Sequence, residues 1–237
     1  MGYNSGELIR TKHNILTMPP WDLEYYHKMW DAMAELANYA LTLEGNYTNK
    51  KKLALDLGCG QGDLMSSLSR VGFQAIGVDF EWRCALDSKK RGIVVLGDIM
   101  MADSFIRPES FDVVLSSHVL EHIENPKAAV QIMKKISRRW LVIAVPNLTR
   151  LVNWFLRKPR YINPGHLHGW DAHHLKTFLE VNCGLKIVRW KQDVVLLTYL
   201  RRSFIRKARP FRFLEESLLP FIIPQGANSL IVLCEKV

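Results

Sequence analysis

The stretch that decides the fold is LALDLGCGQGDL, residues Leu53–Leu64. It joins a short apolar run to an acidic residue, Asp56, and then to three glycines at alternate positions. A short apolar run bounded by glycines is typical of a buried strand, and a glycine-rich turn lets a ligand lie directly on the backbone. We therefore expect a strand that ends at a ligand-binding loop. A tight turn without a ligand would explain one glycine well but three poorly.

Two common phosphate-binding loops do not fit this stretch. A dinucleotide fingerprint, G-x-G-x-x-G, would need a glycine where Asp63 stands, and a P-loop would need Gly-Lys-Ser/Thr, which does not follow. What remains is the pattern D-x-G-x-G-x-G, which consists of Asp56, Leu57, Gly58, Cys59, Gly60, Gln61 and Gly62.

Short apolar runs continue along the chain at intervals of roughly 15 to 25 residues, a spacing typical of βαβ units and a buried parallel sheet. We expect strands at residues 53–57, 74–79, 93–98, 111–117, 140–146, 185–190 and 229–236. Apolar side chains at helical spacing predict a long helix over 21–43. The sequence therefore predicts a single domain over 1–237, with an N-terminal helical segment at 1–50 and elaborations at 148–165 and 193–228.

Acidic residues stand at the ends of three successive strands. Asp79 follows Asp56 by 23 residues and ends the second strand, where a carboxylate can accept both hydroxyls of a ribose. Asp98 ends the third run and precedes Ile99. A single Asp at such a position is commonly a helix N-cap. Three of them beside the glycines indicate one ligand site at the carboxyl edge of the sheet.

At these residues the sequence resembles the class I S-adenosylmethionine-dependent methyltransferases, in particular the branch that includes quinone-biosynthesis O-methyltransferases and related small-molecule enzymes. The resemblance covers about Lys51 to Lys191 and resumes at the final strand. It implies an α/β fold, a single Rossmann-like domain whose seven-stranded sheet is mostly parallel with the last strand antiparallel. It also implies S-adenosylmethionine as the cofactor.

The resemblance assigns roles to individual residues. The segment Asp56–Gly62 would pack on the methionine part of the cofactor, and Asp79 would hold the ribose beside Phe80, which we also count as cofactor-binding. The pair Asp98-Ile99 would frame the adenine. The segment from Ser116 to His118 would lie near the sulfonium, with Ser116 as a cofactor-binding residue.

Methyl transfer from a sulfonium is an in-line displacement, so much of the catalysis can come from positioning and from exclusion of water. A hydroxyl acceptor is helped by a base with a pKa near neutrality, for which histidine is suited. We favour His166 as base or orienter and His118 next, although a structural role explains either histidine at least as well. Asp171 is expected to cap a helix that places His173 and His174 in its first turn, where a structural role is favoured.

The sequence predicts no metal site. A divalent-metal catechol site, as related enzymes build it, would place acids after the fourth and fifth strands, but the residues there are SSH (116–118) and PN (146–147). The motif typical of nucleobase amine methylation and a nucleophilic cysteine after the fourth strand are also absent. Four widely spaced cysteines indicate reduced thiols, and no signal-like or spanning segment is found, so we expect a cytoplasmic protein.

Positive charge is concentrated in one part of the chain, whose formal net charge is +9. Between Gln131 and Arg212 lie 18 of the 32 Lys and Arg residues but only three of the 23 acidic residues. The arginines at 201–212 alternate with apolar residues at helical spacing. Such a segment can form a lid over an apolar acceptor pocket, which is the interpretation we favour. It can also lie on an anionic membrane surface. Nucleic-acid binding is a third hypothesis.

The resemblance and these observations together predict an S-adenosylmethionine-dependent methyltransferase that methylates a hydroxyl oxygen of a small hydrophobic or lipid-linked acceptor. The protein would work in the cytoplasm or at the membrane periphery. The alternatives are an RNA or protein methyltransferase, or a catalytically silent protein that only binds S-adenosylmethionine.

Overall fold

The computed structural model describes residues 20–45, 51–82, 91–149, 165–195, 213–223 and 226–237, with side chains from Tyr26 onward. Its elements are α2 (Pro20–Thr42), β1 (Lys52–Leu57), α3 (Asp63–Arg70), β2 (Phe73–Asp79), β3 (Ile93–Leu96), η2 (Ile99–Met101), α5 (Ala102–Phe105), β4 (Phe111–Ser117), η3 (Leu120–His122), α6 (Pro126–Ile136), β5 (Ser137–Pro146), α8 (Ala172–Thr177), η4 (Phe178–Asn182), β6 (Leu185–Lys191), η7 (Leu214–Leu218), α10 (Leu219–Ile222) and β7 (Ser229–Lys236).

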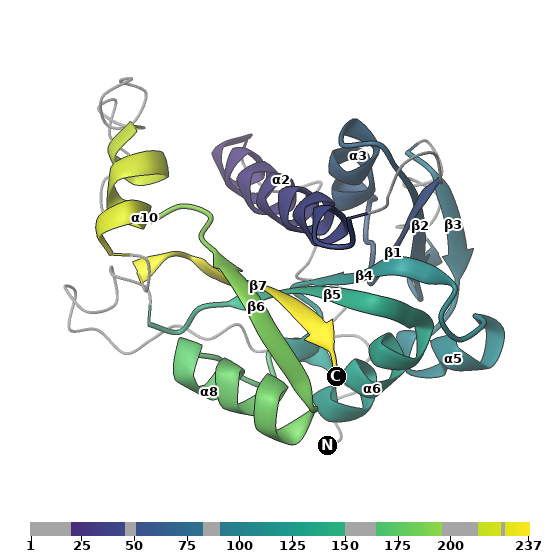
Figure 1. Ribbon diagram of the computed structural model, residues 1–237. Helices are drawn as coiled ribbons and strands as arrows, with labels where there is room; N and C mark the ends of the chain where they lie inside the picture. The colour runs from purple at the N-terminus through teal and green to yellow at the C-terminus, as the bar shows by residue number, and fades with distance from the viewer. Residues whose placement is uncertain (1–19, 46–50, 83–90, 150–164, 196–212, 224–225) are drawn as a thin grey trace, which may run out of the picture.

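One seven-stranded sheet with the order β3-β2-β1-β4-β5-β7-β6 organises these elements (Figure 1). Strand β1 pairs in parallel with both β2 and β4, and β4 pairs in parallel with β5. Strand β7 is antiparallel to its neighbours β5 and β6. The predicted fold class is therefore confirmed. Strand order reverses between β1 and β4, which is where a sheet of this kind binds its ligand, at the carboxyl ends of the strands.

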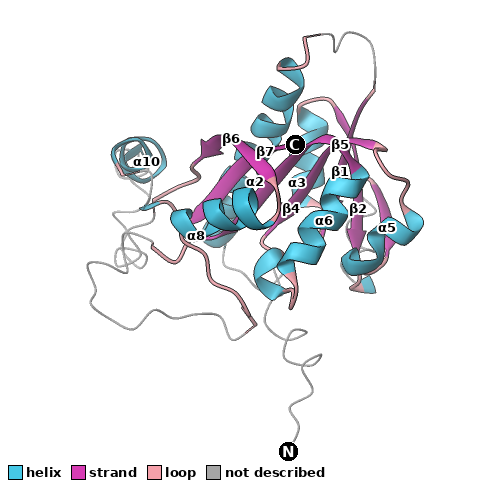
Figure 2. Cartoon of the chain, turned by 60° about the horizontal axis from the view of Figure 1, so that its bottom comes forward, coloured by secondary structure: helices cyan, strands magenta, loops and turns pink. Residues whose placement is uncertain are grey.

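Helices cover both faces of the sheet. Figure 1 shows α2 and α3 on one face and α6 and α8 on the other, and Figure 2 shows the same layers from below. Successive strand side chains point to opposite faces. In β4, Val113 and Leu115 join the core under α2 and α3, while Val114 joins the core under α6 and α8. Because both faces are covered, the central strands are apolar throughout instead of alternating.

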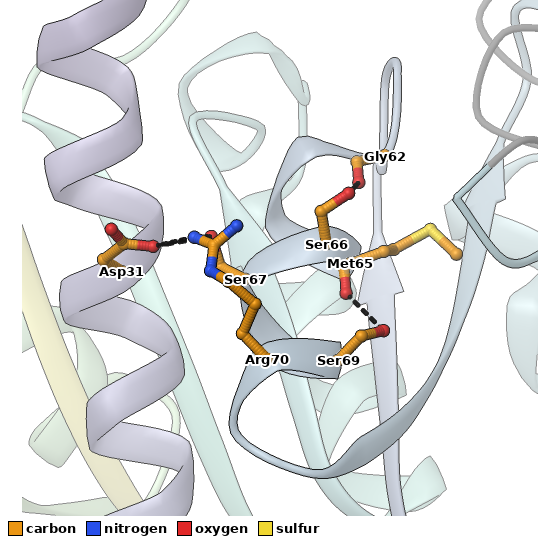
Figure 3. A network of polar contacts seen from close by, with 7 residues as sticks. All are labelled: Asp31, Gly62, Met65, Ser66, Ser67, Ser69 and Arg70. Carbon is orange, nitrogen blue, oxygen red and sulfur yellow. Dashed lines mark hydrogen bonds and ion pairs between the residues drawn. The ribbon is translucent and has the colours of Figure 1, made fainter.

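A polar network fixes α3, the helix that follows the glycine loop, to α2. The Asp31 carboxylate on α2 accepts hydrogen bonds from Ser67 Oγ at 2.8 Å and from the Arg70 guanidinium (Figure 3). At the start of α3, the Ser66 hydroxyl donates to the carbonyl of Gly62 at 3.3 Å. The end of the glycine loop is thus attached to a helix that is itself tied to the long N-terminal helix.

The expected elements match the structure closely, with small differences at their ends. The helix expected at 21–43 is α2, Pro20–Thr42. The third strand ends at Leu96 because Asp98 caps η2, and β5 begins at Ser137, directly after α6. Most of the elaborations at 148–165 and 193–228, including the basic segment 201–212, lies outside the described residues. Among the helices that are described, none combines the length and apolar character that crossing a membrane requires.

Candidate active site

The glycine loop between β1 and α3 depends on backbone conformations that favour glycine. Gly58, Gly60 and Gly62 have φ angles of 81°, 51° and 80°, the left-handed region in which a side chain is strained. The amide N–H groups of Gly58 and Cys59 both donate to the carbonyl of Val78 in β2, at 2.8 and 3.1 Å. The loop is therefore a defined turn held against the neighbouring strand.

Close packing gives a second reason for two of the glycines. A Cβ atom on Gly58 would lie 2.4 Å from Val119 Cγ2, in the turn after β4. A Cβ atom on Gly77, within β2, would lie 2.6 Å from the sulfur of Cys59. Sequence analysis missed the role of Gly77, whose only signal was a glycine inside a strand. These contacts bring the loop, β2 and the turn after β4 together at one edge of the sheet.

Asp79 lies at the end of β2, as predicted for a ribose ligand. Its Oδ2 accepts from the Gly60 N–H at 2.8 Å and its Oδ1 accepts from the Glu81 N–H at 2.9 Å. Burial raises the pKa of this carboxyl, while these backbone donors partly lower it. A carboxylate offers about four acceptor sites, and the backbone N–H groups of Gly60, Phe80 and Glu81 occupy only part of them. Asp79 thus shapes the glycine loop and can still accept ribose hydroxyls, and the adjacent Phe80 is exposed.

Asp56, at the end of β1, is a buried carboxyl without full hydrogen bonding. Its Oδ1 has no hydrogen-bond partner. Burial, followed by the charges of Asp79 and Asp63, raises its pKa to about 8. At neutral pH a carboxyl with this pKa is mainly protonated, and it ionises when a cation pairs with it. Asp56 therefore fits a ligand that brings positive charge to this edge.

The other predicted cofactor residues are placed by the structure but have local roles as well. Asp98 caps η2, where its Oδ1 accepts from the Met100 N–H at 2.8 Å. Ile99 begins η2 and packs against the core on the α6 side. Ser116 is buried within β4. The predicted contacts of these three residues with the cofactor remain predictions.

His118 is the first residue after β4, close to the glycine loop. Its φ of 54° lies in the left-handed region, which is uncommon for residues other than glycine. The ring Nε2 lies 3.0 Å from the hydroxyl oxygen of Ser229 in β7. Because the next residue, Val119, packs against Gly58, the structure brings His118 next to the loop. Its catalytic role stays a prediction.

His166 belongs to a different group, with Glu121 and His122 of η3. The His166 and His122 rings are edge to face with centroids 4.7 Å apart, and Nδ1 of His122 bonds to the carbonyl of Gly165 at 2.8 Å. The ligand-type atoms of Glu121, His122 and His166 lie within 4.8 Å of one another. Sequence analysis missed this group, although the adjacent Glu and His in LEHIENP were a signal.

Glu121 is the most unusual member of that group. Its side chain is buried, and neither carboxyl oxygen has a hydrogen-bond partner. The ring Nε2 of His122 lies 3.9 Å from Oε1 of Glu121. Burial raises the pKa of Glu121 to about 8, so the carboxyl is mainly protonated at neutral pH.

His174, in the first turn of α8, has local contacts. Asp171 caps α8 as predicted, since its Oδ1 accepts from the His174 N–H at 2.8 Å. The His174 ring also bonds to the carbonyl of Gly169, and Trp170 stacks on it with ring centroids 4.9 Å apart. His174 therefore has a structural role in this segment, as expected from its place in the first turn of the helix.

The sheet order, the D-x-G-x-G-x-G loop and the acidic ends of β1 and β2 are those that the sequence predicted for a class I methyltransferase. S-adenosylmethionine carries an ammonium group, a sulfonium and a ribose diol. The buried carboxyl of Asp56 fits a cationic group, and the carboxyl of Asp79 fits a diol. These residues therefore fit the predicted cofactor.

Comparison with known proteins gives the family. A family model described as "Methyltransferase domain" matches residues 25–189, and the chain belongs to this family. A protein of Yersinia pestis named "Ubiquinone biosynthesis O-methyltransferase" is 27% identical over 175 residues, which cover 63% of this chain and 72% of that protein. A protein of the same name from Yersinia pseudotuberculosis has the same identity and coverage.

Solved structures show the same fold. The magnesium protoporphyrin IX methyltransferase of Synechocystis, determined with bound S-adenosylhomocysteine, gives a TM-score of 0.61 at 15% identity and covers 98% of this chain and 94% of its own. An S-adenosylmethionine-dependent methyltransferase of Archaeoglobus fulgidus gives 0.53 at 20% identity, with coverage of 86% and 94%. At such low identity the likeness concerns the fold alone.

Proposed function

We propose that this methyltransferase acts on a hydroxyl oxygen of a small hydrophobic or lipid-linked acceptor. The observation that carries the proposal is the contact between the glycine loop and the turn after β4. There Val119 occupies the space that a Cβ atom on Gly58 would fill, so the preceding residue, His118, lies next to the cofactor loop. The name of the similar Yersinia proteins, which specifies an O-methyltransferase of ubiquinone biosynthesis, supports the same acceptor class.

When bound, S-adenosylmethionine supplies an electrophilic methyl group on sulfur. The protein holds the acceptor hydroxyl in line with that group and excludes water from it. As the acceptor oxygen bonds to the methyl carbon and the carbon–sulfur bond breaks, the hydroxyl proton must leave. The sequence favoured His166 for this step. We assign it instead to the imidazole of His118, because the next residue, Val119, packs on the glycine loop, and we keep His166, whose ring contacts His122, as the alternative. An imidazole suits this task because its pKa lies near neutrality.

Labelled S-adenosylmethionine incubated with fractionated cell extract tests this proposal. We expect label in the organic phase with the wild-type protein and none with Asp79→Ala, which removes the ribose acceptor. His118→Ala and His166→Ala, compared at equal cofactor occupancy, identify the base. Label that appears in RNA or protein would support the alternative substrate classes. Binding of S-adenosylmethionine without transfer to any fraction would leave a catalytically silent binding protein.

We propose in addition that the protein works in the cytoplasm and contacts an anionic membrane through the region around α10. Figures 1 and 2 show this helix beyond the β6–β7 end of the sheet. The segment formed by η7 and α10 exposes Leu218, Phe221 and Ile222. Its two acidic residues lie on η7, where Glu215 is buried and Glu216 pairs with Lys28 at 3.3 Å. Apart from Ser217, the exposed side chains of this segment are therefore apolar.

The sequence carries positive charge directly before this segment. Arg212 precedes the exposed Phe213, and Arg201, Arg202, Arg206, Lys207 and Arg209 come before it in the chain. Apolar side chains flanked by basic residues are typical of peripheral membrane segments.

Vesicle sedimentation tests the membrane contact. The wild-type protein should sediment with phosphatidylglycerol vesicles at low salt, and not with phosphatidylcholine vesicles. Release is expected as the Debye length shortens from about 30 Å at 0.01 M salt to about 10 Å at 0.1 M. Phe221→Ser should weaken the association, while Val181→Ser, at a residue that is also exposed but lies on η4, should not. A protein that ignores vesicles but binds RNA, or one that binds neither, would contradict the proposal.

A further inference from the structure

His118 is held by contacts from three elements that are distant in sequence. Its amide N–H donates to the carbonyl of Ala144 in β5 at 2.9 Å. Its ring packs edge to face against Tyr26 of α2, with centroids 5.7 Å apart. Its Nε2 lies 3.0 Å from Ser229 Oγ, 111 residues away. A left-handed backbone conformation that such contacts maintain is a common feature of functional sites.

Ser229 is itself rigidly placed. It begins β7, and its relative exposure is 1%. Its backbone N–H donates to Oδ1 of Asp193 at 3.2 Å, and Asp193 also receives the N–H of Asn228 at 3.1 Å. Asn147, at the end of β5, donates its own N–H to the carbonyl of Asn228 at 2.9 Å. The position of the Ser229 hydroxyl is thus fixed by the residues that join β6 and β5 to β7.

The Ser229 hydroxyl lies between the His118 ring and the sulfur of Met29. Its Oγ is 3.0 Å from Nε2 of His118 and 3.4 Å from the Met29 sulfur, which can only accept a hydrogen bond. A hydroxyl whose hydrogen points to the sulfur accepts Nε2–H from the ring. In that arrangement the neutral imidazole carries its proton on Nε2, and Nδ1 is the basic nitrogen.

We propose that Ser229 is a positioning residue for methyl transfer, because its hydroxyl holds the His118 imidazole in one orientation and one tautomer beside the glycine loop. The proposal rests on the proposed function, in which His118 accepts the proton of the acceptor hydroxyl. The acceptor oxygen forms its bond to the methyl carbon as the carbon–sulfur bond breaks, and the released proton goes to the imidazole and then to water. Ser229 touches neither substrate nor cofactor and acts only through His118.

The substitution Ser229→Ala removes the hydroxyl and should leave the fold intact. Its matched control is Ser137→Ala. Like Ser229, Ser137 is buried, and its hydroxyl donates a hydrogen bond to the carbonyl of Trp140 at 2.8 Å. Ser137 lies at the start of β5, however, which is the end of that strand remote from the site. With labelled S-adenosylmethionine and the organic-phase acceptor fraction, we expect Ser229→Ala to lower kcat by roughly 10- to 100-fold, as losses of orienting partners do. The Kd for S-adenosylmethionine should not change. Ser229→Thr, which restores the hydroxyl, should recover most of the rate.

Two readouts separate positioning from a merely structural effect. The pH dependence of kcat should shift in Ser229→Ala but not in Ser137→Ala. Nitrogen-15 NMR of the histidine rings should show His118 as the Nε2–H tautomer in the wild type and as a mixture in Ser229→Ala. An unchanged tautomer, or a rate loss equal to that of Ser137→Ala, would overturn the proposal. Absence of transfer by the wild type would overturn the proposed function instead, and the tautomer measurement would still decide whether Ser229 controls His118.

Discussion

At the scale of single residues, the site is marked by carboxyl groups that the protein leaves without enough hydrogen bonds. Asp56 and Glu121 are both buried, both have oxygens without partners, and burial raises the pKa of each to about 8. A fold normally satisfies buried polar groups. Asp56 was predicted from its strand-end position, whereas Glu121 was not, because burial of an acid in a short loop helix cannot be read from sequence spacing.

Glu121 should make the protein less stable as pH rises. Its pKa in the folded state is about 8, above the ordinary value of 4.5 that applies to the unfolded chain. Between these values the unfolded chain loses the proton and the folded protein keeps it, so the free energy of unfolding falls with pH, by up to about 1.4 kcal/mol per pH unit. Glu121→Gln should therefore gain stability relative to the wild type at pH 8 and little at pH 4.5.

Urea denaturation at the two pH values measures this difference. Glu109→Gln is the control, because Glu109 is exposed and Lys236 lowers its pKa, so that variant should show no gain at pH 8. If the difference in free energy of unfolding between the wild type and Glu121→Gln were the same at pH 4.5 and pH 8, the Glu121 carboxyl would be ionised in the folded protein at pH 8.

The prediction of a metal-independent reaction is tested at the same group of residues. Glu121, His122 and His166 are the kinds of side chain that bind metals and are close enough to share one ion. We nevertheless expect methyl transfer to continue after treatment with EDTA, and elemental analysis to find no stoichiometric metal. Loss of activity on chelation, with recovery on addition of Mg²⁺ or Zn²⁺, would refute the prediction, and loss of the bound ion in Glu121→Gln would locate the site.

At the scale of elements, the sequence was most informative where one local rule was sufficient. The strands, α2 and the Asp171 cap were predicted within a few residues because apolar periodicity and capping are local signals. The contact of Val119 with Gly58 and the bond between His118 and Ser229 join elements far apart in the chain. No spacing in one sequence reveals such contacts, which arise only when β4, β5 and β7 come together in the sheet.

The contact between the loop and the turn after β4 predicts different effects for two glycines of the same loop. Gly58→Ala strains a φ of 81° and also places a methyl group 2.4 Å from Val119 Cγ2. Gly60→Ala strains a φ of 51° but meets no atom within 4 Å. Backbone strain costs about 1 to 2 kcal/mol, and overpacking adds about 1 to 3 kcal/mol.

Thermal unfolding and calorimetric binding of S-adenosylmethionine measure both effects. Gly58→Ala should be the less stable variant and should lose affinity, because the loop and the turn must separate to make room for the methyl group. Equal stability of the two variants would mean that the turn after β4 moves freely away from the loop, and it would remove the structural link between His118 and the cofactor site.

At the scale of the whole molecule, one edge of the sheet collects residues from nearly the whole described chain. α2 contributes Tyr26, β1 and β2 contribute the glycine loop and Asp79, and β7 contributes Ser229. This convergence follows from the topology, because parallel strands end at the same edge and the order reverses between β1 and β4. A ligand bound at this edge would bridge several of these elements, so binding should stabilise the fold as a unit.

S-adenosylmethionine should therefore raise the thermal midpoint of the entire domain. A ligand at 100 times its Kd adds about 2.7 kcal/mol to the stability of the folded state, and each kcal/mol corresponds to roughly 2 to 4 °C for a domain of this size. We expect a single transition that moves up by about 5 to 10 °C in the wild type. Asp79→Asn should show much less of this shift, because an amide cannot accept both ribose hydroxyls and because Asp79 also holds the Gly60 N–H. A shift confined to one of two separate transitions would mean that the site belongs to a part of the molecule that unfolds on its own.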